Sequence, residues 1–70
     1  MSMDIIDKIL EQLENGDWHK IDKISKNISL DPNRLLKLIE ILAEIGFIKL
    51  RGDEIAITPM GIDYLSLPEE

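Results

Sequence analysis

The sequence predicts a small, mostly helical α+β domain with a three-helix core, a β-hairpin and a short C-terminal helix. Apolar residues recur at helical spacing in three segments, 3–14, 23–28 and 32–45. Two alternating runs, Phe47–Arg51 and Glu54–Thr58, are separated by only two residues, which predicts a hairpin. The pair Thr58-Pro59 then predicts the start of one more helix. A length of 70 residues leaves room for a single domain, residues 1–70.

The composition excludes several classes of protein. The chain has no cysteine, so neither disulfides nor thiolate metal sites can stabilise it. It has no apolar run of about 18 residues and no signal-peptide pattern at its N-terminus, so we expect a soluble, cytoplasmic protein with no membrane contact.

The net charge of −6 is distributed unevenly along the chain. Residues 1–17 hold five acids and one lysine, for −4, and residues 52–70 hold five acids and no base, for −5. The middle segment, residues 18–51, has seven bases against four acids, for +3. All bases except Lys8 therefore lie in the segment that contains the second and third predicted helices.

The first helix is predicted from Met3 to Glu14, with an apolar stripe opposite a solvated acidic face. Ser2 is a candidate N-cap, and Asn15-Gly16 can adopt the left-handed conformation that ends helices. A brief strand or extended link is predicted at 18–21.

The next two helices are joined by a tight turn, the order of a helix-turn-helix module. Asp22 is expected to cap a short helix, Lys23–Ile28, and Ser29-Leu30 forms the turn. Asp31-Pro32 is a strong start signal for the longer helix, because proline at the first helical position loses no hydrogen bond. That helix is predicted from Pro32 to Ile45, and Gly46 ends it.

The long helix has an unusually wide apolar arc. The residues expected to point inward are Leu35, Leu38, Ile39, Leu42 and Ile45. The two flanks hold Leu36, Ile41 and Ala43. A small polar arc remains, formed by Asn33, Arg34, Lys37, Glu40 and Glu44. A helix of this kind is covered on more than one side, as the central helix of a small domain would be.

A two-residue Gly52-Asp53 turn fixes the hairpin register. The predicted pairs are Arg51 with Glu54, Leu50 with Ile55, Lys49 with Ala56, and Ile48 with Ile57. The side chains expected to face the core are Ile48, Leu50, Ile55 and Ile57, while Lys49 and Arg51 face outward. The helix after Thr58 is expected to fold back on the first helix through Ile62, Tyr64 and Leu65.

This element order resembles the winged-helix DNA-binding domain, and three local motifs agree. The segment 24–32 resembles the family's leucine-alanine…leucine-glycine-leucine-serine-proline turn. Leu42…Gly46-Phe47-Ile48 is similar to its leucine…glycine-leucine-isoleucine. Residues 57–65 resemble the leucine-threonine-proline-x-glycine ending of many small archaeal and bacterial regulators. The resemblance covers nearly the whole chain and implies a winged helix-turn-helix fold.

The resemblance also implies a double-stranded DNA partner for a transcriptional regulator. It places the Pro32–Ile45 helix in the major groove, where Asn33, Arg34 and Lys37 meet bases and phosphates. The expected backbone contacts are Lys20, Lys23, Lys26, Lys49 and Arg51. Arg34 can read guanine and Asn33 adenine, or either can be a solvated surface residue. Dimerisation is expected to raise the affinity.

A second interpretation remains open, in which the module binds another protein instead of DNA. Ser29 stands where the family commonly has glycine, Leu36 where it has a small polar residue, and two carboxylates share the polar arc of the long helix. The partner contacts would then be Leu36 and Ile41. Neither interpretation involves catalysis, because the sequence has no nucleophile–base pattern and no phosphate loop.

Two isolated residues, His19 and Trp18, are of types that often form sites. His19 has no second histidine or cysteine with which to hold a metal, so we expect a surface or half-buried side chain and neither a metal nor a cofactor. Trp18 is expected to plug the core near the first and second helices, with stacking on a base or partner as the alternative.

Overall fold

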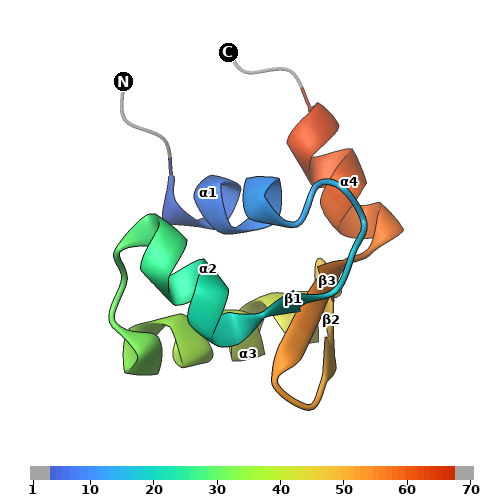
Figure 1. Cartoon of the computed structure of the whole chain (residues 1–70). Helices are drawn as coiled ribbons and strands as arrows, with labels where there is room; N and C mark the ends of the chain where they lie inside the picture. Colours follow the sequence, from blue (N-terminus) through green and yellow to red (C-terminus); the bar gives the residue numbers. More distant parts are fainter. Residues whose placement is uncertain (1–3, 68–70) are drawn as a thin grey trace.

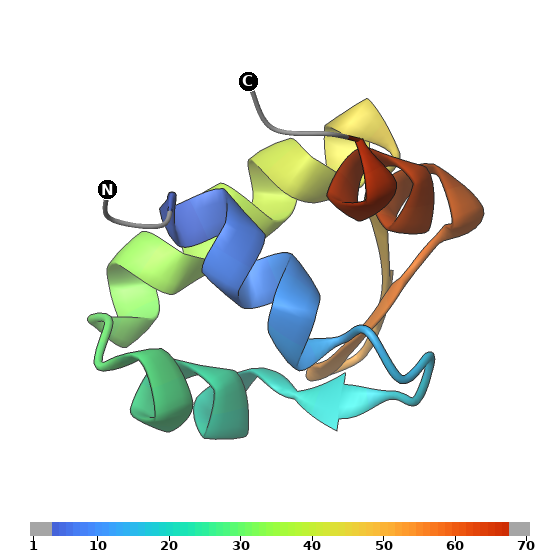
Figure 2. The same cartoon turned by 90° about the horizontal axis from the view of Figure 1, so that it is seen from above.

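Four helices and a small antiparallel sheet surround one hydrophobic cluster in the computed structural model, which describes residues 4–67 (Figure 1). In chain order the elements are α1 (Ile5–Gln12), β1 (His19–Lys20), α2 (Ile21–Ile28), α3 (Pro32–Ile45), β2 (Ile48–Arg51), β3 (Glu54–Ile57) and α4 (Pro59–Ser66). Figure 2 shows α1 lying across α3, with the hairpin and α4 together at one end of the molecule. The predicted α+β, mostly helical fold is confirmed, and α3 begins and ends at the predicted residues.

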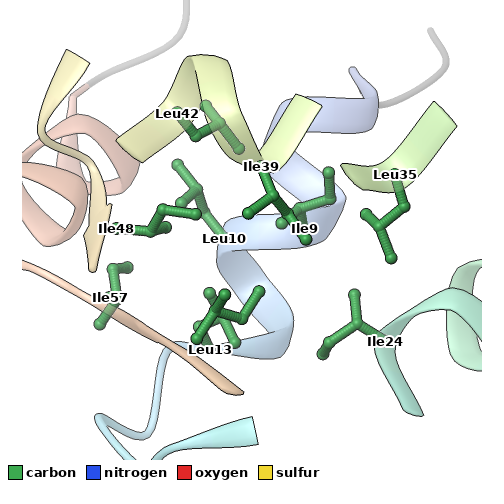
Figure 3. Packing of buried hydrophobic residues seen from close by; sticks show 10 residues of the cluster. Ile9, Leu10, Leu13, Ile24, Leu35, Ile39, Leu42, Ile48 and Ile57 are labelled. Carbon is green, nitrogen blue, oxygen red and sulfur yellow. The ribbon is translucent and has the colours of Figure 1, made fainter. Parts of the chain in front are cut away.

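The core lies where α1, α2 and α3 meet the inner face of the sheet (Figure 3). Its buried members are Ile9, Leu10, Leu13, Ile24, Leu35, Ile39, Leu42, Ile48, Ile55 and Ile57. Every element from α1 to β3 except β1 contributes to this list, which explains how a chain without disulfides is stabilised.

The sheet has the strand order β1-β3-β2, and all four predicted hairpin pairs are confirmed. Gly52 has a positive φ of 60°, as the first residue of a two-residue hairpin turn requires. The prediction that Leu50 is buried is wrong, because its side chain is 48% exposed. Leu50 lies on an edge strand near the hairpin turn, whereas its partner Ile55 lies on the central strand and is fully buried.

The first two helices begin at residues other than the predicted caps. Asp4, not a residue further upstream, is the N-cap of α1, and its side chain accepts a hydrogen bond from the backbone N–H of Ile6. Ser2, the predicted cap, lies outside the described residues. The predicted capping role of Asp22 is wrong, since α2 begins at Ile21, two residues before the predicted start, and Asp22 lies in its first turn.

Two serines shape the turn between α2 and α3. Ser25 is buried, and its hydroxyl donates a hydrogen bond of 2.6 Å to the carbonyl of Leu30, which closes the turn. Ser29 ends α2 in the left-handed conformation, with φ 54° and ψ 44°. This conformation is unfavourable for a residue with a Cβ atom, and it explains why glycine suits the position.

We expect Ser29→Gly to raise the free energy of unfolding by about 0.5–1 kcal/mol. The left-handed conformation costs a non-glycine residue about 1–2 kcal/mol, and part of this gain is offset by the greater freedom of glycine in the unfolded chain. Urea unfolding measures the change. Ser25→Gly is the matched control and should destabilise, because it removes the hydroxyl bond to Leu30. A Ser29→Gly variant less stable than the wild type would contradict the assigned conformation.

Helix α3 has the predicted signals at both ends. The Asp31 carboxylate accepts hydrogen bonds from the backbone N–H groups of Asn33 and Arg34, at 3.1 and 3.3 Å. Gly46 ends the helix with φ 101°. Ile45, predicted to point inward, is instead about half exposed.

Helix α4 packs closely on the hairpin because Gly61 has no side chain. A Cβ atom at this position would lie 2.4 Å from the carbonyl oxygen of Phe47. Thr58 caps α4 by accepting a hydrogen bond from the N–H of Gly61. Tyr64 packs on the core, with 4.9 Å between the centroids of its ring and that of Phe47. Ile62, in contrast, is 44% exposed, contrary to the prediction.

The same helix contacts α1, and the electrostatics of Tyr64 reflect this contact. The negative charge of Asp7 raises the pKa of the Tyr64 hydroxyl, and burial and the charge of Asp4 raise it further. The expected return of the last helix to the first is therefore confirmed for Tyr64.

Candidate nucleic-acid interface

The exposed face of α3 carries a polar stripe that changes in charge along its length. Asn33, Lys37, Glu40 and Glu44 are spaced four, three and four residues apart, so they lie along one side of the helix. All four are exposed, as is Arg34 beside them. The N-terminal half of the stripe is therefore basic and amide-bearing, and the C-terminal half is acidic.

The backbone N–H groups of Asn33 and Arg34 in the first turn of α3 are not free, because both donate hydrogen bonds to the Asp31 carboxylate. A phosphate approaching this end must be bound by side chains instead of by the helix terminus.

Arg34 and Lys37 are brought together at the edge of a shallow, open groove of about 470 Å³. The floor of this groove is apolar and consists of Ile5, Leu30 and Leu38. Arginine and lysine have long aliphatic side chains that end in a charged group. Their aliphatic parts can cover the apolar surface while the charged ends bind an anion. The structure thus places these two predicted site residues side by side.

The predicted backbone-contact residues of α2 and the sheet are exposed, but they form separate groups. Lys23 and Lys26 lie on the outer side of α2. Lys20 precedes α2 and forms an ion pair with Asp53 in the hairpin turn, with a distance of 3.6 Å between Nζ and Oδ2. Both partners of this pair are largely exposed, so it contributes little to stability.

The wing, defined as the β2–β3 hairpin, holds Lys49 and Arg51 over the ring of Trp18. The Arg51 guanidinium carbon lies 4.1 Å from the ring centroid, and the Lys49 ammonium nitrogen lies 5.4 Å from it. Arg51 also donates to Glu54 at 3.2 Å. The expectation that Trp18 plugs the core is wrong, because its ring lies under these cations and is absent from the core cluster.

Sequence analysis missed the stacking role of Trp18. The pairing of Arg51 with Glu54 follows from the hairpin register, which is local in the sequence. The position of Trp18 depends on the pairing of β1 with β3, which joins residues more than 30 positions apart, as His19 with Ile55 shows. The sequence holds no signal for that register.

His19 is half buried, and its Nε2 atom lies 2.9 Å from the side-chain oxygen of Asn15. Among residues 4–67, no three His, Asp or Glu side chains gather as they would around a metal ion. Within the same residues no helix is long and apolar enough to cross a membrane.

The two residues of the alternative interpretation, Leu36 and Ile41, are both exposed, at 44% and 51%. They lie on opposite flanks of the polar stripe of α3, five residues apart in the sequence. The structure therefore does not join them into one apolar patch.

Comparisons with known proteins agree with the architecture. A family model described as "Winged helix-turn-helix" matches residues 1–70. The crystal structure of the hypothetical protein SSo2273 from Sulfolobus solfataricus is similar, with a TM-score of 0.76 and 24% sequence identity. That match covers 84% of this chain and 49% of that chain, so this chain spans about half the length of its structural neighbour. No curated protein sequence matches the chain significantly.

Proposed function

Because the chain belongs to the winged helix-turn-helix family, we propose that it binds double-stranded DNA through α3 and acts as a transcriptional regulator. The observation that carries this proposal is the basic, amide-bearing N-terminal half of the exposed face of α3. Asn33, Arg34 and Lys37 are exposed there on a helix whose opposite face is buried in the core. In helix-turn-helix complexes the N-terminal residues of the recognition helix contact the base edges.

The acidic half of α3 is compatible with this orientation. Each helical residue advances about 1.5 Å along the axis, so Glu44 lies about 10 Å beyond Lys37. When the helix enters a groove about 12 Å wide with its N-terminus first, Glu44 stays near the rim or outside it. Glu40 lies between the two and is the carboxylate that most opposes phosphate binding.

Leu36 has a role in this arrangement as well. It is exposed one turn after Asn33, on the flank of the stripe. The methyl group of thymine is the apolar feature of the major groove, and apolar side chains contact it. We infer that Leu36 selects thymine at one position of the target, next to the base read by Asn33.

The overall charge of −6 does not prevent DNA binding, because the charges are distributed unevenly and residues 18–51 carry a net +3. All seven bases of residues 18–51 are exposed. Ten of the 14 acids lie in residues 1–17 and 52–70, although two of these, Asp53 and Glu54, belong to the wing and pair with Lys20 and Arg51. The molecule measures 33 × 25 × 20 Å, and α1 lies on the side of α3 that faces the core (Figures 1 and 2). Since salt screens exposed charges over about 8–10 Å, the acids of α1 act weakly at a DNA surface bound by the opposite face of α3.

We expect the chain to bind a labelled mixed-sequence DNA duplex, with an affinity that falls steeply as salt is raised from about 50 to 200 mM. Each phosphate neutralised contributes about −0.9 to the slope of log affinity against log salt, so four or five contacts give a slope near −4. Fluorescence anisotropy at several salt concentrations measures it. The absence of binding at the lowest salt would exclude the proposal.

The stoichiometry separates this function from the alternative. A regulator that acts as a homodimer is expected to bind two copies per duplex site, because a single module of this size makes few contacts. Analytical ultracentrifugation of the protein with and without duplex DNA counts the copies. A protein that stays monomeric and ignores DNA would instead favour a protein partner contacted through Leu36 or Ile41.

A further inference from the structure

The outer face of the sheet carries two rows of side chains set by the strand register. The register pairs Lys20 with Glu54 and Glu54 with Arg51, and it pairs Ala56 with Lys49. Continued one residue before His19, it places Trp18 opposite Ala56. The two rows are therefore Lys20–Glu54–Arg51 and Trp18–Ala56–Lys49.

Ala56 is the small residue that lets the indole lie on the sheet. It is fully buried, yet it is not part of the core cluster, because its side chain is on the outer face with Lys49. The register places Trp18 opposite Ala56 on this face, and Lys49 and Arg51 lie over the Trp18 ring. Both cations of the wing therefore contact the same aromatic ring.

The stacking geometry leaves Arg51 able to bind an oxygen anion. A guanidinium contacts an aromatic ring with its flat face, while its N–H donors lie in its own plane and point away from the ring. Among the residues that the structure describes, the Arg51 guanidinium has one side-chain acceptor, the Glu54 carboxylate, which is bound by Nη2. The other donors remain for a phosphate.

Holding a long cationic side chain in place before binding favours the bound state. An arginine or lysine side chain has about 2 kcal/mol of rotamer entropy, and part of it is lost when the side chain is immobilised on a ligand. A ring that already restrains the side chain reduces this loss at the moment of binding.

We propose that Trp18 is the positioning residue of the wing, which holds Arg51 and Lys49 for contact with DNA phosphates beside the groove that α3 enters. This inference rests on the proposed DNA-binding function and assigns the wing contacts of that function. Trp18 acts through the two cations and does not itself contact the duplex.

The test compares Trp18→Phe and Trp18→Leu with the wild type in duplex-binding titrations at low salt. Trp18→Leu keeps an apolar cover over Ala56 but removes the aromatic face, so we expect roughly two- to fivefold weaker binding. Trp18→Phe keeps a smaller aromatic face, so its affinity should lie between the two. Thermal unfolding of each variant checks that it is folded, and if Trp18→Leu does not fold, the loss in Trp18→Phe decides.

A second set of titrations separates positioning from a purely structural role. In a Lys49→Ala/Arg51→Ala background, Trp18→Leu should change the affinity by less than about twofold, because the cations that it positions are gone. An equal loss in both backgrounds would overturn the proposal, as would wild-type affinity in Trp18→Leu. Since Trp18 is the only tryptophan, its fluorescence should also change on DNA addition with the same midpoint as binding.

The failure of this inference is distinct from the failure of the proposed function. If the wild type does not bind duplex DNA at low salt, the proposed function fails and the positioning role fails with it. If the wild type binds and the Trp18 variants bind equally well, only the positioning role is overturned.

Discussion

Replacing Arg34 and Lys37 together with alanine is expected to weaken duplex binding at least tenfold. A bidentate arginine–guanine contact is worth about 1–3 kcal/mol, and the loss of one lysine–phosphate contact reduces the salt slope by about 1. The two side chains lie together at the exposed edge of α3, so the double variant removes the basic part of the recognition surface. Anisotropy titrations at several salt concentrations measure both the affinity and the slope.

Lys8→Ala is the matched control for lost charge. Lys8 is exposed on α1, beside Glu11 and Gln12, and α1 lies on the core side of α3. Lys8 shares a groove with Asn27, Ile28 and Ser29 at the end of α2, but it is not one of the proposed contact residues. Its removal lowers the positive charge by one and keeps all proposed contacts, so the affinity should change by less than about twofold through screened interactions. An Arg34→Ala/Lys37→Ala variant that binds as tightly as the wild type would show that another face contacts the DNA.

The largest expected effect on stability belongs to Ile39→Ala. Ile39 is 1% exposed and packs in the cluster where α3 meets α1 and α2. Truncation of such a side chain costs about 2–5 kcal/mol through lost transfer free energy and the remaining cavity. In a domain of this size a loss of about 2 kcal/mol lowers the midpoint of thermal unfolding by about 10 °C. Circular dichroism melting measures the change.

Ile41→Ala provides the comparison within the same helix. Ile41 is 51% exposed, so its truncation removes little buried surface, and alanine has the higher helix propensity. The variant should unfold within about 0.5 kcal/mol of the wild type. If Ile41→Ala were as destabilising as Ile39→Ala, the assigned orientation of α3 would be wrong. A loss of stability that depends on protein concentration would instead indicate that Ile41 is buried between copies.

The predictions that were confirmed depend on chemistry that is local in the sequence. Asp31-Pro32 and Gly46 each fix one end of α3 through the residue's own backbone preference, so the bounds of this helix could be predicted. The two-residue turn at Gly52-Asp53 fixes the hairpin register for the same reason. The fold class followed from these signals together with the helical spacing of leucine and isoleucine.

The predictions that were wrong concern how deeply a surface is covered. Ile45 and Leu50 both have the spacing of core residues, yet each is about half exposed; Ile45 is the last residue of α3, and Leu50 lies on an edge strand. Periodicity gives the direction of a side chain, but its burial depends on whether another element reaches that point. The same holds for Ile62 on α4, which is 44% exposed.

The sequence by itself determined the order of the elements, the ends of α3 and the composition of its outward face. Those features need only backbone preferences and spacing, which act over a few residues. Only the tertiary structure decided that Trp18 lies under Lys49 and Arg51, because that contact depends on β1 pairing with a strand more than 30 residues away. The sequence therefore predicts Lys49 and Arg51 as two separate exposed charges, whereas the structure shows both in contact with the Trp18 ring.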